Sequence, residues 1–144
     1  SFLAEEFLEA RWNEHPLRPT FEPSESKLLL HGHCHQKALW GVESSAALLR
    51  RIYGSRLDVL KTGCCGMAGS FGFTADRYEL SMAIANLDNG LGLLPAIAKD
   101  ASATVCAPGT SCRHQVLDGA ARHARHPIEI VRAALRRSTE PSRS

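Results

Sequence analysis

The chain has 144 residues, of which 44% are hydrophobic and 22% are charged, and its formal net charge is +2. This length and composition predict one globular domain, and the small net charge argues against a nucleic-acid partner. No apolar run reaches the roughly 20 residues that a membrane-spanning helix needs. Five cysteines without a secretory signal favour metal ligands or redox thiols over a disulfide framework. We therefore expect a cytoplasmic chain that does not span a membrane, with peripheral association to the inner membrane left open.

The elements predicted in chain order alternate between strands and helices. Apolar runs predict buried strands, which are expected at 27–33, 56–61 and 103–107, with a fourth short strand at 122–126. Apolar residues at steps of three and four predict helices, which are expected at 1–10, 39–53, 74–87, 93–99, 111–121 and 128–137. This alternation predicts an α/β fold, with a mostly parallel sheet of about four strands flanked by helices.

Two predictions concern surfaces outside the sheet. The first helix is expected to have an apolar side formed by Phe2, Leu3, Phe7 and Leu8. The basic residues from Arg122 to Arg137 are expected to form a solvated face or to contact a domain outside this chain, because no aromatic residues are interleaved with them.

The segment 62–73, TGCCGMAGSFGF, carries the strongest functional signal. Its adjacent cysteines, Cys64 and Cys65, lie among four glycines at a step of three, which are Gly63, Gly66, Gly69 and Gly72. A vicinal disulfide strains the peptide between its cysteines, whereas two thiols in a glycine-rich turn can bind one soft cation. We predict that this loop is the centre of a metal or iron–sulfur site. A phosphate cradle is the alternative, although the loop lacks the ending of a nucleotide-binding motif.

Every cysteine follows or ends a predicted strand. Cys34 follows the first strand, Cys64 and Cys65 follow the second, Cys106 ends the third and Cys112 comes after it. Because ligands collect at the carboxyl edge of parallel sheets, all five thiols are predicted to reach one edge. Cys112 would begin a helix, whose dipole is expected to lower the pKa of its thiol. The predicted metal ligands are Cys34, Cys64, Cys65 and Cys112, and Cys106 is either a fifth ligand or a buried small side chain.

Histidines alternate around Cys34. On a strand, His31, His33 and His35 would share one face, where histidine can ligate a metal or donate a hydrogen bond to sulfur. Polar residues at the exposed end of a strand are the alternative interpretation. The predicted cofactor-binding residues are His33, Gly63, Gly66 and Gly69.

Three segments, HGHCHQKAL at 31–39, GCCGMAGSFGF at 63–73 and APGTSCRHQ at 107–115, resemble the cysteine-rich CCG domain. That domain occurs in heterodisulfide reductase, in iron–sulfur subunits of glycolate and glycerol-3-phosphate oxidoreductases, and in FAD-linked D-lactate or D-2-hydroxyglutarate-type dehydrogenases. The three segments are most similar to the last group, and the resemblance covers about residues 27–135. The family pattern is one cysteine, then CCG, then a closing CxxC. Cys34, Cys64, Cys65 and Cys112 fall on it, and Gly109 stands where the first closing cysteine would be.

The resemblance implies an electron-transfer domain for this chain. It implies a cluster of the 4Fe-4S type, an FAD and further iron–sulfur domains elsewhere in the same polypeptide or complex, and a downstream electron acceptor. It divides the chain into an N-terminal helix and linker (1–26), a CCG domain (27–137) and a disordered tail (138–144). Whether this chain alone is an enzyme stays open, and a non-catalytic part of an FAD and iron–sulfur oxidoreductase is implied. The alternatives are a structural zinc site on an interaction domain and a thiol redox module.

Overall fold

The protein is described by a computed structural model for residues 4–14, 20–22, 26–39 and 41–135. Within these residues three parallel strands form one sheet in the order β2-β1-β3, and they are β1 (Leu28–Leu30), β2 (Leu57–Val59) and β3 (Thr104–Cys106). The predicted α/β fold is confirmed. The predicted fourth strand is reduced to a single parallel bridge between Arg125 and Cys106, because α7 begins two residues later at Pro127. The predicted tail at 138–144 lies outside the described residues.

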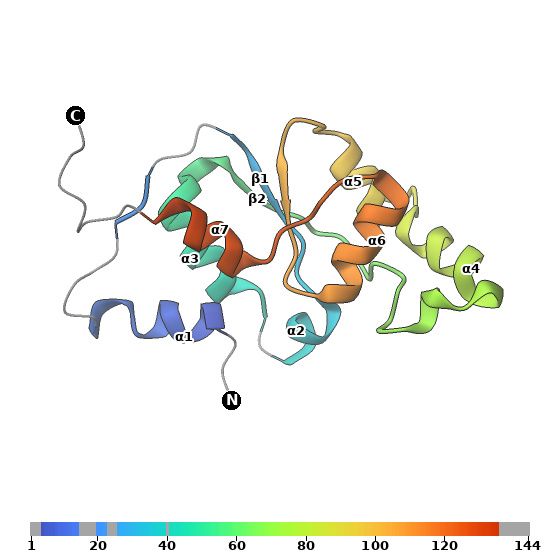
Figure 1. Cartoon of the computed structure of the whole chain (residues 1–144), viewed down its shortest axis with the longest axis horizontal. Coiled ribbons are helices and arrows are strands. Elements are labelled where there is room, and N and C mark those ends of the chain that lie inside the picture. Colours follow the sequence, from blue (N-terminus) through green and yellow to red (C-terminus); the bar gives the residue numbers. More distant parts are fainter. Residues whose placement is uncertain (1–3, 15–19, 23–25, 40, 136–144) are drawn as a thin grey trace.

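Helices cover both faces of the sheet (Figure 1). The α-helices of the described residues are α1 (Ala4–Ala10), α2 (Cys34–Leu39), α3 (Glu43–Tyr53), α4 (Ala75–Ala85), α5 (Leu93–Ala98), α6 (Thr110–Ala120) and α7 (Pro127–Ala134). Single 3-10 turns are η1 (Trp12–Glu14), η2 (Gly54–Arg56) and η3 (Phe71–Phe73). In Figure 1, α1, α3 and α7 lie to one side of the strands, and α4, α5 and α6 lie to the other.

The side chains of β1 point alternately into two hydrophobic cores, as the two-residue period of a strand requires. Leu28 and Leu30 pack in a core with residues of α3 and α7. Leu29 packs in a second core with residues of α5 and α6. All three leucines are buried and the strand pairs in parallel with both neighbours, so the prediction of a buried parallel strand from the continuous apolar run is confirmed.

The helix predicted at 39–53 begins only at Glu43, after a break at Gly41, and a separate helix that was not predicted precedes the break. Gly41 has a φ of +78°, a left-handed conformation that glycine adopts readily. The break at Gly41 separates α2, which ends at Leu39, from α3, which begins at Glu43. Because β1 ends at Leu30 and α2 starts four residues later, the prediction that His31, His33 and His35 share one strand face is wrong.

The N-terminal helix packs through a polar residue. Glu5 is 1% exposed and accepts a hydrogen bond of 3.3 Å from the Ser45 hydroxyl of α3. Phe7 and Leu8 of the predicted apolar side are exposed, and Phe2 and Leu3 lie outside the described residues. The hydrogen bond from Ser45 satisfies part of the hydrogen-bonding capacity of the buried carboxylate. It therefore offsets part of the free-energy cost of burying Glu5.

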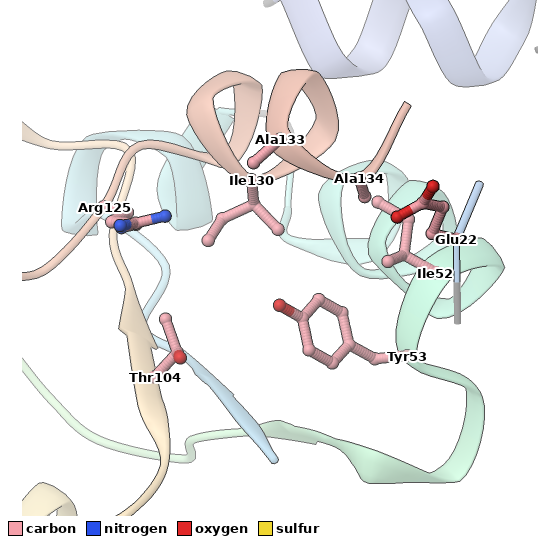
Figure 2. A pocket seen from close by; sticks show the side chains of 8 residues that line it. All are labelled: Glu22, Ile52, Tyr53, Thr104, Arg125, Ile130, Ala133 and Ala134. Carbon is pink, nitrogen blue, oxygen red and sulfur yellow. The ribbon is translucent and has the colours of Figure 1, made fainter. Parts of the chain in front are cut away.

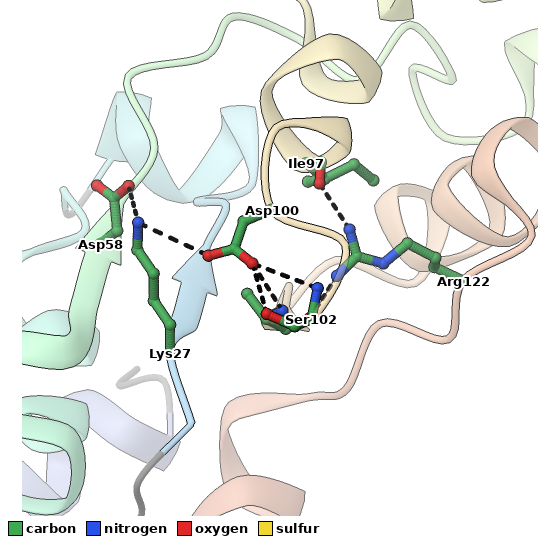
Figure 3. A network of polar contacts seen from close by, with 7 residues as sticks. Lys27, Asp58, Ile97, Asp100, Ser102 and Arg122 are labelled. Carbon is green, nitrogen blue, oxygen red and sulfur yellow. Dashed lines mark hydrogen bonds and ion pairs between the residues drawn. The ribbon is translucent and has the colours of Figure 1, made fainter.

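Charged side chains that form ion pairs and hydrogen bonds lie near the amino ends of the strands (Figure 3). Lys27 Nζ lies 3.7 Å from an Asp58 oxygen and 3.9 Å from an Asp100 oxygen. The guanidinium of Arg122 donates to the carbonyl oxygens of Ile97 and Ala103. The predicted solvated basic face is therefore wrong for Arg122, which is half-buried and ties α5 to the start of β3.

A pocket of about 220 Å³ lies between α3, α7 and the start of β3 (Figure 2). Tyr53, Thr104, Arg125 and Ile130 are among the residues that line it. Because Thr104 begins β3, this pocket lies away from the carboxyl ends of the strands, where the cysteine-bearing loops start.

Candidate functional site

Three connections leave the carboxyl ends of the strands and carry the thiols of interest. Cys34 begins α2 after β1, Cys64 and Cys65 lie in the loop after β2, and Cys112 lies in the first turn of α6 after β3. The connection after β1 leads to β2 on one side of it, and the connection after β2 leads to β3 on the other side of β1. Such a reversal of strand order is where ligands bind in open parallel sheets.

The structure brings these four predicted side chains together. The thiol of Cys65 contacts the thiols of Cys112 and Cys64, and the thiol of Cys64 contacts that of Cys34. All four are free thiols, with Cys65 and Cys112 buried, Cys64 half-buried and Cys34 exposed. Residues nearly eighty positions apart in the chain thus form one group, which we call the thiol cluster.

Cys106 does not join the thiol cluster, so the prediction that all five thiols share one edge is wrong for this residue. Its thiol is fully buried in the core beneath α3 and α7. Cys106 pairs in register with Leu30, and both side chains point into that core. Burial raises the pKa of the Cys106 thiol. This is the environment of a small apolar side chain, which was the alternative interpretation.

Hydrogen-bond donors surround the sulfur of Cys65. The contact with the Cys112 thiol lowers the pKa of Cys65 most, to about 6, and the N–H groups of Met67 and Ala68 add to this effect against desolvation. The same contact, together with burial, raises the pKa of Cys112. The expectation that a helix start lowers the pKa of Cys112 is therefore wrong, because Cys112 acts as the donor to Cys65.

The sulfur of Cys64 has a different environment from that of Cys65. The N–H of Gly66 donates to Cys64 Sγ at 3.3 Å. Desolvation nevertheless raises the pKa of Cys64, and the neighbouring thiols of Cys65 and Cys34 act in the same direction. Of these two adjacent residues, only Cys65 is thus held in an environment that favours the thiolate.

Lys37 places a positive charge beside the thiol cluster. Its Nζ donates a hydrogen bond of 2.7 Å to the carbonyl oxygen of Thr62. Burial lowers the pKa of Lys37, and the negative charge of each of the four clustered thiolates raises it. The sequence analysis missed Lys37. Had α2 been predicted to begin at Cys34, the spacing of three residues would have placed Lys37 on the same side of the helix.

His31 and Thr62 connect the end of β1 to the cysteine loop. Both side chains are buried, and His31 Nδ1 lies 2.7 Å from Thr62 Oγ1. Burial lowers the pKa of His31 to about 3, and the charges of Lys37 and His33 act in the same direction. The ring is therefore neutral at neutral pH, and its role in the structure is to hold the loop.

The other two histidines differ in exposure. His33 is half-buried and its ring packs on the backbone of Gly109, near Cys112. Burial lowers the pKa of His33, and the nearby His35 adds to this effect. His35 is exposed, with its ring centroid 6.4 Å from that of His33. Of the two, His33 is the one that lies beside the thiol cluster.

The predicted cofactor-binding glycines have three different structural roles. Gly66 has a φ of +89°, and a Cβ there would lie 2.2 Å from the carbonyl oxygen of Ser81, so the loop passes directly against α4. Gly69 has a φ of +71° and open space around it. The N–H of Gly63 donates to the Leu91 carbonyl oxygen at 2.8 Å. This N–H is therefore already used, which weakens the phosphate-cradle alternative.

The residues of the thiol cluster fit a thiolate-ligated group by their chemistry. Four soft sulfur donors, backbone N–H groups directed at sulfur and a lysine are the features that stabilise an iron–sulfur cluster, and four thiols also suit zinc. Within the described part of the chain, however, no group of three or more His, Cys, Asp or Glu side chains is arranged to hold a metal ion. The thiols instead contact one another in pairs.

The fold and the thiol cluster together define an α/β domain with thiols at the carboxyl edge of a parallel sheet. The chain is 31% identical over 114 residues to a subunit of the anaerobic glycerol-3-phosphate dehydrogenase of Escherichia coli K12, covering 79% of this chain and 28% of that protein. It is 30% identical over 132 residues to the D-2-hydroxyglutarate dehydrogenase of the same organism, covering 90% of this chain and 12% of that protein. It is 33% identical over 105 residues to the D-2-hydroxyglutarate dehydrogenase of Pseudomonas putida, covering 71% of this chain and 10% of that protein.

These comparisons relate the chain to dehydrogenases, one of which is by name a subunit of a larger enzyme. The chain spans only a minor part of the length of each of these relatives. No family model and no solved structure matches it. In the part of the chain that the structure describes, every helix is too short or too polar to cross a membrane.

Proposed function

We propose that this chain is an electron-transfer domain that binds an iron–sulfur cluster, of the 4Fe-4S type, through Cys34, Cys64, Cys65 and Cys112. The single observation that carries this proposal is the meeting of four thiols from three connections beside one lysine. The kinship with dehydrogenases supports a redox role for that group of thiols. The mutual contacts of the thiols imply that they separate when the cluster is inserted.

The chain's own residues would hold and tune such a cluster. The four cysteines bind it as thiolates, and the N–H groups of Gly66, Met67 and Ala68 donate to sulfur and stabilise negative charge. Lys37 offsets that charge from the side of α2. When bound, the cluster accepts and donates one electron at a time. The residues proposed to lie against the cofactor are Gly63, Gly66, Gly69 and His33.

The rest of the proposed enzyme lies outside this chain. An FAD in another domain of the same polypeptide or complex takes a hydride from a 2-hydroxy acid of the D-lactate, glycolate or D-2-hydroxyglutarate type. This domain then receives the electrons and passes them towards further iron–sulfur domains and a downstream acceptor. We expect the isolated chain to have no dehydrogenase activity. Turnover of D-lactate or D-2-hydroxyglutarate by this chain alone would contradict the division of roles.

Anaerobic reconstitution with iron and sulfide tests the proposal. The wild-type chain should become brown, bind iron and sulfide, and give a paramagnetic signal in one of its redox states. Cys65→Ser should lose most of the bound iron. Cys106→Ala is the matched control and should keep it, because Cys106 lies in a separate core. A colourless protein with stoichiometric zinc would favour the structural zinc site instead, and equal iron loss in both variants would refute the assignment of ligands.

A thiol redox module is the second candidate function, and the Cys65–Cys112 contact favours it. An acidic thiol in contact with a neighbouring thiol can attack a disulfide substrate, releasing one substrate thiol and forming a mixed disulfide. Cys112 would then displace the second substrate thiol and leave a Cys65–Cys112 disulfide, so that one disulfide is reduced as another forms. Trapping of a mixed disulfide on Cys65 in a metal-free Cys112→Ser variant would support this candidate.

A further inference from the structure

The pocket between α3, α7 and the start of β3 is lined by three side chains whose hydrogen-bonding groups are unused. Arg125, Tyr53 and Thr104 line this pocket of about 220 Å³. Among the described residues, none of these three side chains makes a hydrogen bond or an ion pair. Figure 2 shows the Tyr53 ring reaching from α3 towards Arg125 and Thr104, with its hydroxyl at the leading end. One guanidinium and two hydroxyls are therefore free to bind a ligand at this place.

The backbone of Arg125 is held firmly beside β3. Its N–H donates to the Val105 carbonyl oxygen and its carbonyl oxygen accepts from the N–H of Ala107, both at 2.9 Å. The guanidinium is exposed and forms no ion pair with a described carboxylate, although Glu129 follows one turn later in α7. A fixed backbone that carries an unpaired guanidinium is suited to bind an anion. The planar fork of arginine matches the two oxygens of a carboxylate in particular.

The rest of the lining determines the body of the ligand. The pocket has an aliphatic wall formed by Ile52, Ile130, Ala133 and Ala134. Glu22 lines the pocket at the far end of α7 from Arg125, because its N–H donates to the Ala134 carbonyl oxygen at 2.8 Å. Figure 2 shows Glu22 and Arg125 on opposite sides of the pocket. The carboxylate of Glu22 therefore disfavours a second negative charge on a ligand that binds Arg125.

We propose that this pocket binds a small aliphatic monocarboxylate. The carboxylate pairs with Arg125 and accepts hydrogen bonds from the hydroxyls of Tyr53 and Thr104, and the hydrocarbon chain lies against α7. At roughly 30 Å³ for each water molecule, the pocket has room for about seven waters, which suits a ligand of about eight non-hydrogen atoms. This binding activity goes beyond the proposed electron transfer, because Thr104 begins β3 and the thiol cluster lies past the other end of the strands.

The wild-type chain tests the proposal without any substitution. The chain is labelled with ¹⁵N and titrated with hexanoate, and the amide signals are followed by nuclear magnetic resonance. The shifts should saturate and be largest around Tyr53, Thr104 and Arg125. Hexanamide has nearly the same shape without the charge, so it should bind at least about tenfold more weakly. Adipate brings a second carboxylate towards Glu22 and should bind at least about threefold more weakly than hexanoate.

Substitutions then assign the interaction to particular side chains. Arg125→Met should weaken the binding of hexanoate at least about tenfold, and Tyr53→Phe about three- to tenfold. Arg132→Met is the matched control, because it removes the same charge from an exposed position of α7 that does not line the pocket. Its affinity for hexanoate should stay within about twofold of wild type. Glu22→Gln should bring the affinities for adipate and hexanoate together.

The wild-type titrations decide the proposal even if a variant fails to fold. Equal affinities for hexanoate and hexanamide would overturn the role of Arg125, and shifts that do not saturate would show that no site exists. An equal loss of affinity in Arg125→Met and Arg132→Met would also overturn the proposal, because it would reveal attraction to the basic surface alone. The result is independent of the thiol cluster. Failure to bind iron on reconstitution would refute the proposed function and leave this inference standing.

Discussion

His31 Nδ1 lies 2.7 Å from Thr62 Oγ1, and this buried contact joins the end of β1 to the start of the cysteine loop. Burial keeps the His31 ring neutral by lowering its pKa to about 3. In the unfolded chain the ring has a pKa of about 6.5. As pH falls below that value, the unfolded state binds a proton that the folded state does not. The free energy of unfolding therefore decreases from about pH 6.5 towards about pH 3.

The variant His31→Asn tests this dependence on pH. Its amide can keep the contact with Thr62, but it does not titrate. Urea unfolding between about pH 7 and about pH 5 should show that the wild type loses stability more steeply, by up to about 1.4 kcal/mol per pH unit. A parallel loss of stability in the two proteins over this range would show that His31 is not kept neutral by the fold.

Gly66 and Gly69 both have positive φ values, yet their replacement by alanine should have very different effects. At Gly66 a Cβ would lie 2.2 Å from the Ser81 carbonyl oxygen, which belongs to the backbone of α4 and cannot move aside. At Gly69 nothing lies within 4 Å, so the effect is limited to the left-handed backbone, about 1–2 kcal/mol.

Urea unfolding of the two alanine variants is the measurement. Gly66→Ala should lose at least about 3 kcal/mol, because backbone strain adds to displacement of the loop from α4. It should also disturb Cys64 and Cys65, which precede it directly. Similar losses in Gly66→Ala and Gly69→Ala would mean that the loop does not pack against Ser81 as described.

The strands and the positions of the cysteine loops could be predicted from the sequence because their signals are local. The run at 28–30 is apolar on both faces, and Cys64 and Cys65 follow the next predicted strand, at 56–61. The general rule for parallel sheets then places the loops at one edge. Cys106 and Cys112 are only six residues apart, but the first belongs to a strand and points into a core while the second begins a helix. Separating them required the direction of each side chain, which spacing alone does not supply.

The polar contacts between distant residues were not predictable. Arg122 has no local feature that directs it to the carbonyl oxygens of Ile97 and Ala103. Glu5 is an ordinary surface residue by its sequence and is buried only because α1 packs on α3. Gly41 is a local signal that separates α2 from α3, and α2 is the helix that brings Lys37 to the thiol cluster.

Lys37 should control the acidity of the clustered thiols in the metal-free protein. Replacing it by methionine removes the positive charge that favours thiolates, so the pKa of Cys65 should rise. At about pH 5, below the Cys65 pKa of about 6, the rate of alkylation of Cys65 should fall by about three- to tenfold, which corresponds to a rise of about half to one pKa unit. Mass spectrometry after brief exposure to iodoacetamide gives the rate for each cysteine.

Two control variants separate charge from structure in this test. Lys37→Arg keeps the positive charge and should leave the alkylation rate close to that of wild type. Lys27→Met removes a lysine at the other end of the sheet, where it lies between Asp58 and Asp100, and should have little effect. An alkylation rate in Lys37→Met equal to that of the wild type would show that the charge of Lys37 does not act on Cys65.

Ser45 links the helix that begins at Cys34 to the N-terminal helix. Its hydroxyl accepts a hydrogen bond of 2.9 Å from Gln36 Nε2 of α2 and donates one of 3.3 Å to Glu5 of α1. All three side chains are at least 95% buried. Ser45→Ala removes the shared partner and leaves a buried amide and a buried carboxylate without it. We expect a loss of about 2–4 kcal/mol in the free energy of unfolding.

Ser44→Ala is the matched control, because the neighbouring residue is only half-buried and the chemical change is identical. Its effect should stay within about 0.5 kcal/mol of the wild type. Glu5→Gln in addition tests the charge, since it keeps an acceptor for the Ser45 hydroxyl and removes the cost of a buried carboxylate. It should therefore destabilise less than Ser45→Ala. Equal stabilities of Ser45→Ala and Ser44→Ala would show that the hydrogen bonds of Ser45 do not hold α1 and α2 to α3.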